Sequence, residues 1–125
     1  MSKIAAFFVA LVALIHTYIA WFEIFAWESR GPRVFSAFPA ELFEQTTALA
    51  ANQGLYNGFL AAGLIWSLLI RDAKWQRNVA TCFLIFVAVA GIFGAVTADT
   101  KTIYVQLIPA SMGLACVWLI KPRSA

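Results

Sequence analysis

Four long apolar segments alternate with short polar connections along the chain. At about 1.5 Å of rise per residue, helices of such length suit a hydrocarbon layer of roughly 30 Å. The pattern therefore predicts an all-α fold, a four-transmembrane-helix bundle forming a single integral membrane domain over residues 1–125. The predicted spans cover approximately residues 4–27, 47–70, 78–98 and 102–120.

The connection between the first two predicted spans is the longest, and it interleaves apolar with charged residues. We expect Gly31-Pro32 to break the first helix, because proline lacks a backbone donor. Ser36, Pro39 and Glu41 are typical of a helix start, with acidic residues following in the first turn. We therefore expect a short amphipathic helix that lies on the membrane surface between spans 1 and 2. The connections at residues 71–77 and 99–101 are expected to be short polar turns.

The composition supports a membrane protein. Hydrophobic residues make up 62% of the chain and charged residues 12%, whereas a soluble domain is roughly half apolar and a quarter charged. The mean hydropathy of +0.81 agrees with a lipid bilayer as the main partner. The net charge of +3 is small and gives no indication of nucleic-acid binding. The first apolar segment has no small-x-small cleavage site, so we interpret it as an uncleaved span.

The placement of Lys and Arg predicts the orientation in the membrane. Six of the nine lie at the N-terminus, in the second connection and at the C-terminus, and three lie in the other two connections. This bias predicts a multi-pass protein of the bacterial inner membrane with both termini in the cytoplasm. The six are Lys3, Arg71, Lys74, Arg77, Lys121 and Arg123.

The second predicted span begins with four polar side chains that fall within one helical arc of about 140°. These four are Asn52, Gln53, Tyr56 and Asn57. Gly54 and Gly58 lie on the opposite side, where small residues let another helix come close and offer a face for homo-oligomerisation. Polar groups in a membrane are costly without partners, so this helix is expected to form the wall of a polar site. Interhelical hydrogen bonding alone would also account for the four polar groups.

His16 and Glu23 share one face of the first predicted span, about 10 Å apart along the helix axis. His16 is interpreted either as a structural residue that bonds a neighbour or as a ligand-contacting, proton-handling group. Ligation of haem or a metal by this lone histidine is less favoured, because no His pair or Cys–His spacing supports a metal site. Glu23 is interpreted either as a hydrated interfacial residue or as a partly buried carboxylate that binds a cation or takes a proton.

Span direction places most of the polar side chains at similar depth, in the outer half of the bundle. Pro109 adds to this region, because it leaves the carbonyl of Val105 without its usual donor beside Gln106. We therefore predict one shared ligand-binding site; its cofactor, if it has one, is unknown, and no metal is indicated. The predicted site residues are His16, Glu23, Asn52, Gln53, Tyr56, Asn57 and Gln106.

Several motifs together resemble a family of small bacterial membrane proteins catalogued as a domain of unknown function. The residues that carry the resemblance are His16 to Trp27, the string Asn52-Gln53-Gly54-Leu55-Tyr56-Asn57-Gly58-Phe59, Ala90 to Ala95, and Gln106 to Ala110. The resemblance covers nearly the whole chain. It implies an integral membrane protein with four spans, and it implies no activity.

Three functions remain open from the sequence. The chain could bind or transport a small molecule or ion in a polar pocket. It could be a membrane enzyme or redox partner that acts on a lipophilic substrate such as a quinone. It could also be a structural subunit. Because the sequence has no paired-carboxylate, nucleophile–base or phosphate-loop motif, we rank an enzyme below a binding protein.

Overall fold

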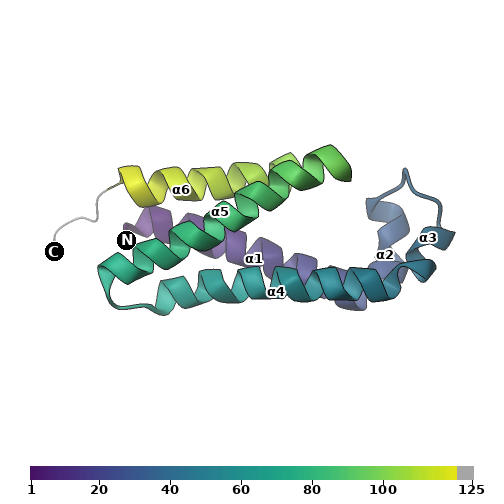
Figure 1. Ribbon diagram of the computed structural model, residues 1–125, viewed down its shortest axis with the longest axis horizontal. Helices are drawn as coiled ribbons and strands as arrows, with labels where there is room; N and C mark the ends of the chain where they lie inside the picture. Colours follow the sequence, from purple (N-terminus) through teal and green to yellow (C-terminus); the bar gives the residue numbers. More distant parts are fainter. Residues whose placement is uncertain (121–125) are drawn as a thin grey trace. The chain divides into compact units, whose positions relative to one another are not determined.

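The computed structural model describes residues 1–120, which form helices joined by short loops (Figure 1). No strand occurs among these residues, which confirms the predicted all-α class. Lys121 and Arg123, two of the charges counted at the C-terminus, lie outside the described residues. The elements are α1 Lys3–Phe25, α2 Trp27–Val34, α3 Glu41–Gln45, α4 Thr47–Leu69, α5 Ala73–Thr97, the π-helix η1 Ile103–Leu107 and α6 Ile108–Leu119.

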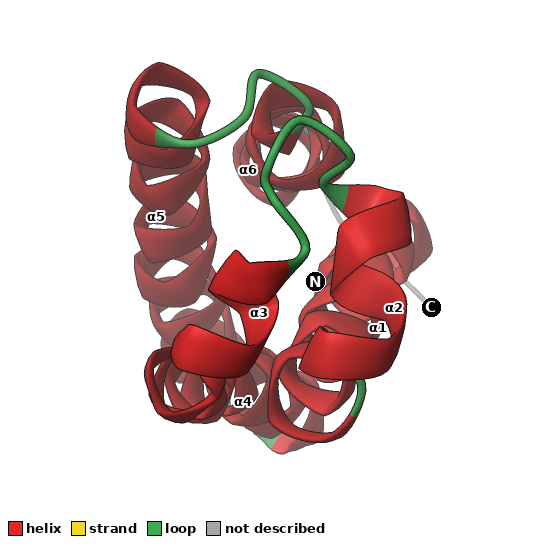
Figure 2. Ribbon diagram, turned by 90° about the vertical axis from the view of Figure 1, so that its right-hand side faces the viewer, coloured by secondary structure: helices red, strands yellow, loops and turns green. Residues whose placement is uncertain are grey.

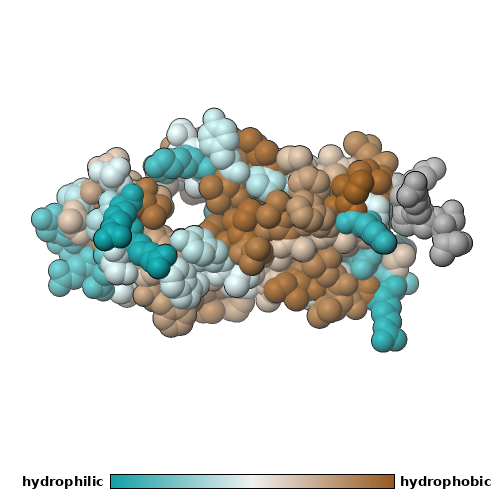
Figure 3. All heavy atoms as spheres, turned by 180° about the vertical axis from the view of Figure 1, so that it is seen from behind, coloured by the Kyte–Doolittle hydropathy of each residue, from teal (hydrophilic) through white to brown (hydrophobic). Residues whose placement is uncertain are grey.

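Helices occupy all four predicted spans. By length and composition, α1 and α5 are each able to cross a membrane, and the helix over Ile103–Leu119 is apolar but shorter. α4 has 23 residues, but its first half carries the polar stretch. Only 33% of the apolar segment of α1 and 28% of that of α5 are buried. Hydrophobic side chains therefore cover much of the exterior of the long helices (Figure 3).

The helices divide into two compact units whose boundaries fall within α1 and α4. One unit, here the α5–α6 unit, contains Met1–Ile15 and the described residues from Leu60 onward. The other, here the α2–α3 unit, contains His16–Phe59. The α5–α6 unit therefore joins two segments that are distant in the sequence, whereas the α2–α3 unit is one continuous stretch of chain.

The α5–α6 unit has a core of small and branched aliphatic side chains. Within it, α5 lies beside η1 and α6 (Figure 1). Several core positions are alanines, whose small side chains let helix backbones come close together. The core consists of Ala5, Val9, Val12, Ala13, Leu64, Ala80, Leu84, Val87, Ala110 and Val117.

The last helix of the chain begins with a π-helical turn rather than a regular one. Pro109 cannot donate a backbone hydrogen bond, and its ring would collide with the carbonyl of Val105 in a regular helix. The wider turn of a π-helix accommodates such a site. The sequence predicted that Pro109 disrupts the regular helical hydrogen bonding, and in the structure this disruption is the π-helical turn η1. Gly91 of α5 faces this segment, where an added Cβ would be 2.7 Å from the backbone nitrogen of Leu107.

An aromatic cluster organises the α2–α3 unit. The ring of Trp27 lies 5.1 Å from that of Phe43 and 5.8 Å from those of Phe22 and Phe35, measured between ring centres. Edge-to-face and tilted contacts at such distances are favourable for aromatic rings. The indole nitrogen of Trp27 also donates a hydrogen bond of 3.0 Å to Thr46 Oγ1. The cluster therefore ties α2 to α3 and to the residues just before α4. α2 and α3 lie side by side (Figure 2).

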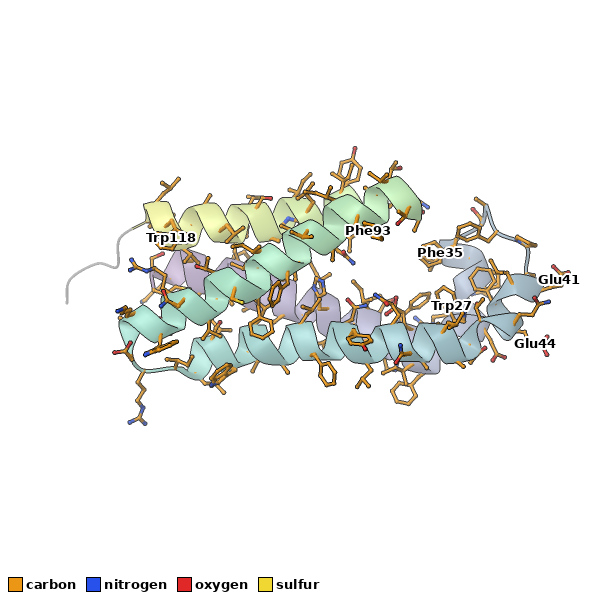
Figure 4. All side chains as sticks on the ribbon, viewed as in Figure 1. Trp27, Phe35, Glu41, Glu44, Phe93 and Trp118 are labelled. Carbon is orange, nitrogen blue, oxygen red and sulfur yellow. The ribbon has the colours of Figure 1, made fainter. Side chains whose placement is uncertain are left out.

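The predicted short helix in the first connection corresponds to α3. Its apolar side faces the aromatic cluster, since Phe43 is buried. Glu41 and Glu44 are exposed and point away from Trp27 and Phe35 (Figure 4). α3 is therefore amphipathic, and its location on a membrane surface stays a prediction.

The predicted break at Gly31-Pro32 was wrong. α1 ends at Phe25, the chain bends at Ala26, and Gly31-Pro32 lies inside α2. A proline removes only one hydrogen bond, and here it stands near the end of a helix of eight residues. Gly31 is buried under the ring of Phe43, with which an added Cβ would collide. The glycine therefore serves close packing of α2 against α3 and does not end a helix.

The turn before α5 is shorter than predicted. We expected residues 71–77 to be a polar turn, but α5 begins at Ala73. The carboxylate of Asp72 accepts a hydrogen bond of 2.8 Å from the backbone nitrogen of Trp75, the typical role of an N-cap. Lys74 and Arg77 therefore lie in the first turns of α5 rather than in a loop.

Replacing the cap with Asp72→Ala is expected to lower the free energy of unfolding by about 1 kcal/mol, because the amide of Trp75 loses its acceptor. Asp72→Asn is the matched control, since it removes the charge but keeps an acceptor. Thermal unfolding in detergent, followed by circular dichroism, measures both. A loss as large in Asp72→Asn as in Asp72→Ala would contradict the capping role.

Candidate functional site

A carboxyl group and an amide meet between α1 and α4 in the α2–α3 unit. The Nδ2 of Asn57 donates a hydrogen bond of 2.8 Å to Glu23 Oε2. The same nitrogen lies 3.3 Å from the backbone oxygen of Gln53. Asn57 is only 5% exposed, and Glu23 is half-buried. Two of the predicted site residues from different spans are therefore in direct contact.

Gly54 lets the two helices come close enough for this contact. An added Cβ at Gly54 would be 2.8 Å from Ile24 Cγ1 and 3.0 Å from both the backbone oxygen of Ala20 and the Cβ of Glu23. At Gly58, one turn further along α4, the nearest atom to an added Cβ would be Ala20 Cβ at 3.9 Å. The closest approach of α1 and α4 in this region therefore lies at Gly54, one turn before Asn57.

The other three residues of the predicted polar arc of α4 are exposed, namely Asn52, Gln53 and Tyr56. Asn57 lies at the edge of the predicted polar arc, about 60° around the helix from Gly54. It therefore turns inward with the glycine, while the rest of the arc turns outward. A site that the exposed residues share with Glu23 and Asn57 stays a prediction.

His16 is completely buried in α1, two helical turns before Glu23. It interacts with another residue of the structure. Burial of a histidine in an apolar helix fits either of the roles that the sequence left open, structural or proton-handling. Its membership of a common site with Glu23 stays a prediction.

Gln106 lies in η1, in the α5–α6 unit, and is half-buried. The π-helical turn sets its position, and its Cβ would be 3.1 Å from a Cβ added at Gly91. Since Gln106 and the other predicted site residues belong to different units, a site that they share stays a prediction.

The contacts at the start of α4 were not anticipated from the sequence. The hydroxyl of Thr47 donates a hydrogen bond of 2.7 Å to Glu28 Oε1, beside the bond between Trp27 and Thr46. These pairs fix the segment that leads into α4, and hence the helix that carries Asn57. Thr46 and Thr47 stand directly before an apolar segment, and their two hydroxyl groups were the only feature of the sequence that indicated such contacts.

Within residues 1–120, no three side chains of His, Cys, Asp or Glu gather in a way that could hold a metal ion. One carboxylate oxygen of Glu23 accepts from Asn57, which leaves the second oxygen and the Asn57 carbonyl available as acceptors. The arrangement can bind a small cation or a molecule with hydrogen-bond donors.

Comparison with known proteins identifies the family but gives no activity. Residues 10–118 match the family described as "Protein of unknown function (DUF1304)". The chain is similar to "Uncharacterized protein YpaA" of Lactococcus lactis subsp. lactis (strain IL1403), at 35% identity over 98 residues, 77% of this chain and 81% of that protein. No solved structure gives a significant match. The family match covers most of the chain, including the Glu23–Asn57 pair, so the chain belongs to the DUF1304 family.

Proposed function

We propose that this chain is an integral membrane protein in which Glu23 and Asn57 bind a small cation or polar molecule, for binding or transport. The observation that carries the proposal is the hydrogen bond of 2.8 Å between these residues. It places an acidic side chain and an amide between two long helices of apolar composition. Polar side chains in such positions are costly, so they are commonly functional.

A membrane setting is supported by the exposed hydrophobic surface. Phe93 and Val96 of α5 are 69% and 82% exposed, and Leu119 of α6 is 80% exposed. Soluble monomers rarely expose large contiguous apolar patches. The proposal includes four spans in the bacterial inner membrane with both termini in the cytoplasm, following the distribution of Lys and Arg.

The chemistry of the pair favours a cation. Hard cations prefer oxygen ligands from carboxylates, amides and backbone carbonyls. Glu23 supplies its second carboxylate oxygen and Asn57 its amide oxygen, neither of which takes part in the hydrogen bond between the two residues. A solute that carries an ammonium group would meet the same acceptors.

Ion flux into proteoliposomes tests the proposal, with sodium ions and protons as the probes. Glu23→Gln is expected to lower the flux of the transported ion by about tenfold, the effect of roughly 1.4 kcal/mol, because the carboxylate charge is lost. It keeps an acceptor for Asn57, so the fold is expected to survive. Glu41→Gln is the matched control, because Glu41 is exposed on α3. Equal flux through both variants and the unchanged protein would contradict transport of either ion at this site.

A structural role is the second candidate, and the hydrogen bond itself favours it. A satisfied polar pair between two helices contributes to their association in a membrane. In that case Glu23→Gln changes only the thermal stability of the protein. Measuring flux and unfolding on the same preparations therefore separates the two functions.

A further inference from the structure

A cavity of about 230 Å³ opens at the end of the α5–α6 unit where α5 begins and α6 ends. Two basic side chains of α5, Lys74 and Arg77, line it. Trp118 and Val117 of α6 also line it. The cavity thus combines two basic side chains with an aromatic and aliphatic surface.

The guanidinium group of Arg77 is held in place by Trp118. The guanidinium carbon lies 4.7 Å from the centre of the indole ring, a cation–π contact. The indole nitrogen of Trp118 in turn donates a hydrogen bond of 3.1 Å to Thr81 Oγ1. A stacked guanidinium keeps its N–H groups at the edge, where they can bind the oxygens of a phosphate in a paired fashion.

The charge around the cavity is positive. Among residues 1–120, no acidic side chain forms an ion pair with Lys74 or Arg77. Asp72 is the nearest acidic residue in the sequence, but it does not line the cavity and its carboxylate caps the amide of Trp75. The first residue of α5, Ala73, also lines the cavity, so the positive end of the helix dipole adds to the field. The favoured ligand is therefore an anion.

Trp118, which lines the cavity, and several residues that are close in the sequence to lining residues are exposed aromatic or aliphatic side chains. Trp75 and Trp118 are 62% and 57% exposed, and Trp118 lies near the end of α6 in Figure 4. Leu69 and Leu119 are also exposed. Trp together with Lys and Arg is typical of the boundary between lipid tails and water, and basic pockets at that level bind lipid head groups.

From this geometry we infer that the cavity binds the phosphate-bearing head group of an anionic phospholipid. Arg77 and Lys74 contact the phosphate, and the exposed apolar surface beside Trp118 accommodates the acyl chains. A free phosphate ion would use the two cations but not the apolar surface. The inference rests on the membrane setting proposed above, and it does not depend on the Glu23–Asn57 site.

Native mass spectrometry of the purified full chain tests this site, with phosphatidylglycerol and phosphatidylcholine as the probes. The protein is expected to retain phosphatidylglycerol in preference to phosphatidylcholine. Arg77→Gln and Lys74→Gln are each expected to weaken that retention by about tenfold, because each removes a charge-assisted contact to the phosphate. Arg71→Gln is the matched control, since it removes the same charge from an exposed residue that does not line the cavity.

Three outcomes would overturn the inference. One is equal retention of the two lipids, and another is a loss in Arg71→Gln as large as in Lys74→Gln, which would indicate surface charge alone. The third is binding of inorganic phosphate as tightly as phosphatidylglycerol, which would indicate a site for a soluble anion. Lys74→Gln keeps the test valid if Arg77→Gln unfolds, and the ion-flux assay of Glu23→Gln is an independent measurement.

Discussion

Asn57→Leu is expected to lower the free energy of unfolding by about 1–3 kcal/mol, because it leaves the half-buried carboxyl group of Glu23 without its donor. The leucine also fills a position that is only 5% exposed, so its hydrophobic gain is expected to offset only part of this loss. Unfolding in a mild detergent titrated with dodecyl sulfate measures the change.

Asn52→Leu is the control for this substitution, because Asn52 is exposed on the same helix and is expected to change stability little. A double-mutant cycle with Glu23→Leu isolates the pair. If the hydrogen bond operates, the double variant is more stable than the sum of the two single losses predicts. Additive losses would show that the two side chains do not interact in solution.

The positions of the long helices could be predicted from the sequence, because apolar segments of that length specify helices without reference to their neighbours. Their ends were less predictable. α5 begins at Ala73 because Asp72 caps it, and α2 includes Gly31-Pro32 because the ring of Phe43 covers the glycine. An aspartate before a helix can be recognised as a cap from the sequence alone. The packing of Phe43 on Gly31 cannot, because the two residues are twelve positions apart.

The Glu23–Asn57 contact shows what the sequence could and could not supply. Glu23 and Asn57 were both identified as polar residues that need partners, and the structure joins them. The sequence could not show that Asn57 turns away from Asn52 and Tyr56, because helical periodicity leaves the rotation of a helix toward its neighbour undetermined. The close contact of Gly54 with α1 determines this rotation of α4.

The basic cavity in the α5–α6 unit was not predicted at all. Lys74 and Arg77 were used only as charges that orient the chain in a membrane. Their spacing of three residues puts them on one face of a helix, but only if the helix has already begun at Ala73. The approach of Trp118 from α6 is a tertiary contact, which no local pattern could supply.

A comparison of Gly54→Ala with Gly58→Ala should reveal the close contact of α1 and α4. The two substitutions add the same methyl group, one turn apart on the same helix, and each gains up to about 1 kcal/mol of helix propensity. At Gly54 the methyl meets the backbone oxygen of Ala20 at 3.0 Å, and a backbone atom cannot move aside alone.

Gly54→Ala is therefore expected to be less stable than Gly58→Ala by about 1–3 kcal/mol, the usual cost of overpacking. At Gly58 the methyl makes an ordinary contact, so that variant should equal or exceed the stability of the unchanged protein. Because the extra methyl pushes α1 away from α4, Gly54→Ala should also weaken the coupling between Glu23 and Asn57 in the double-mutant cycle. Equal stability of the two variants would show that α1 does not pack against Gly54 in solution.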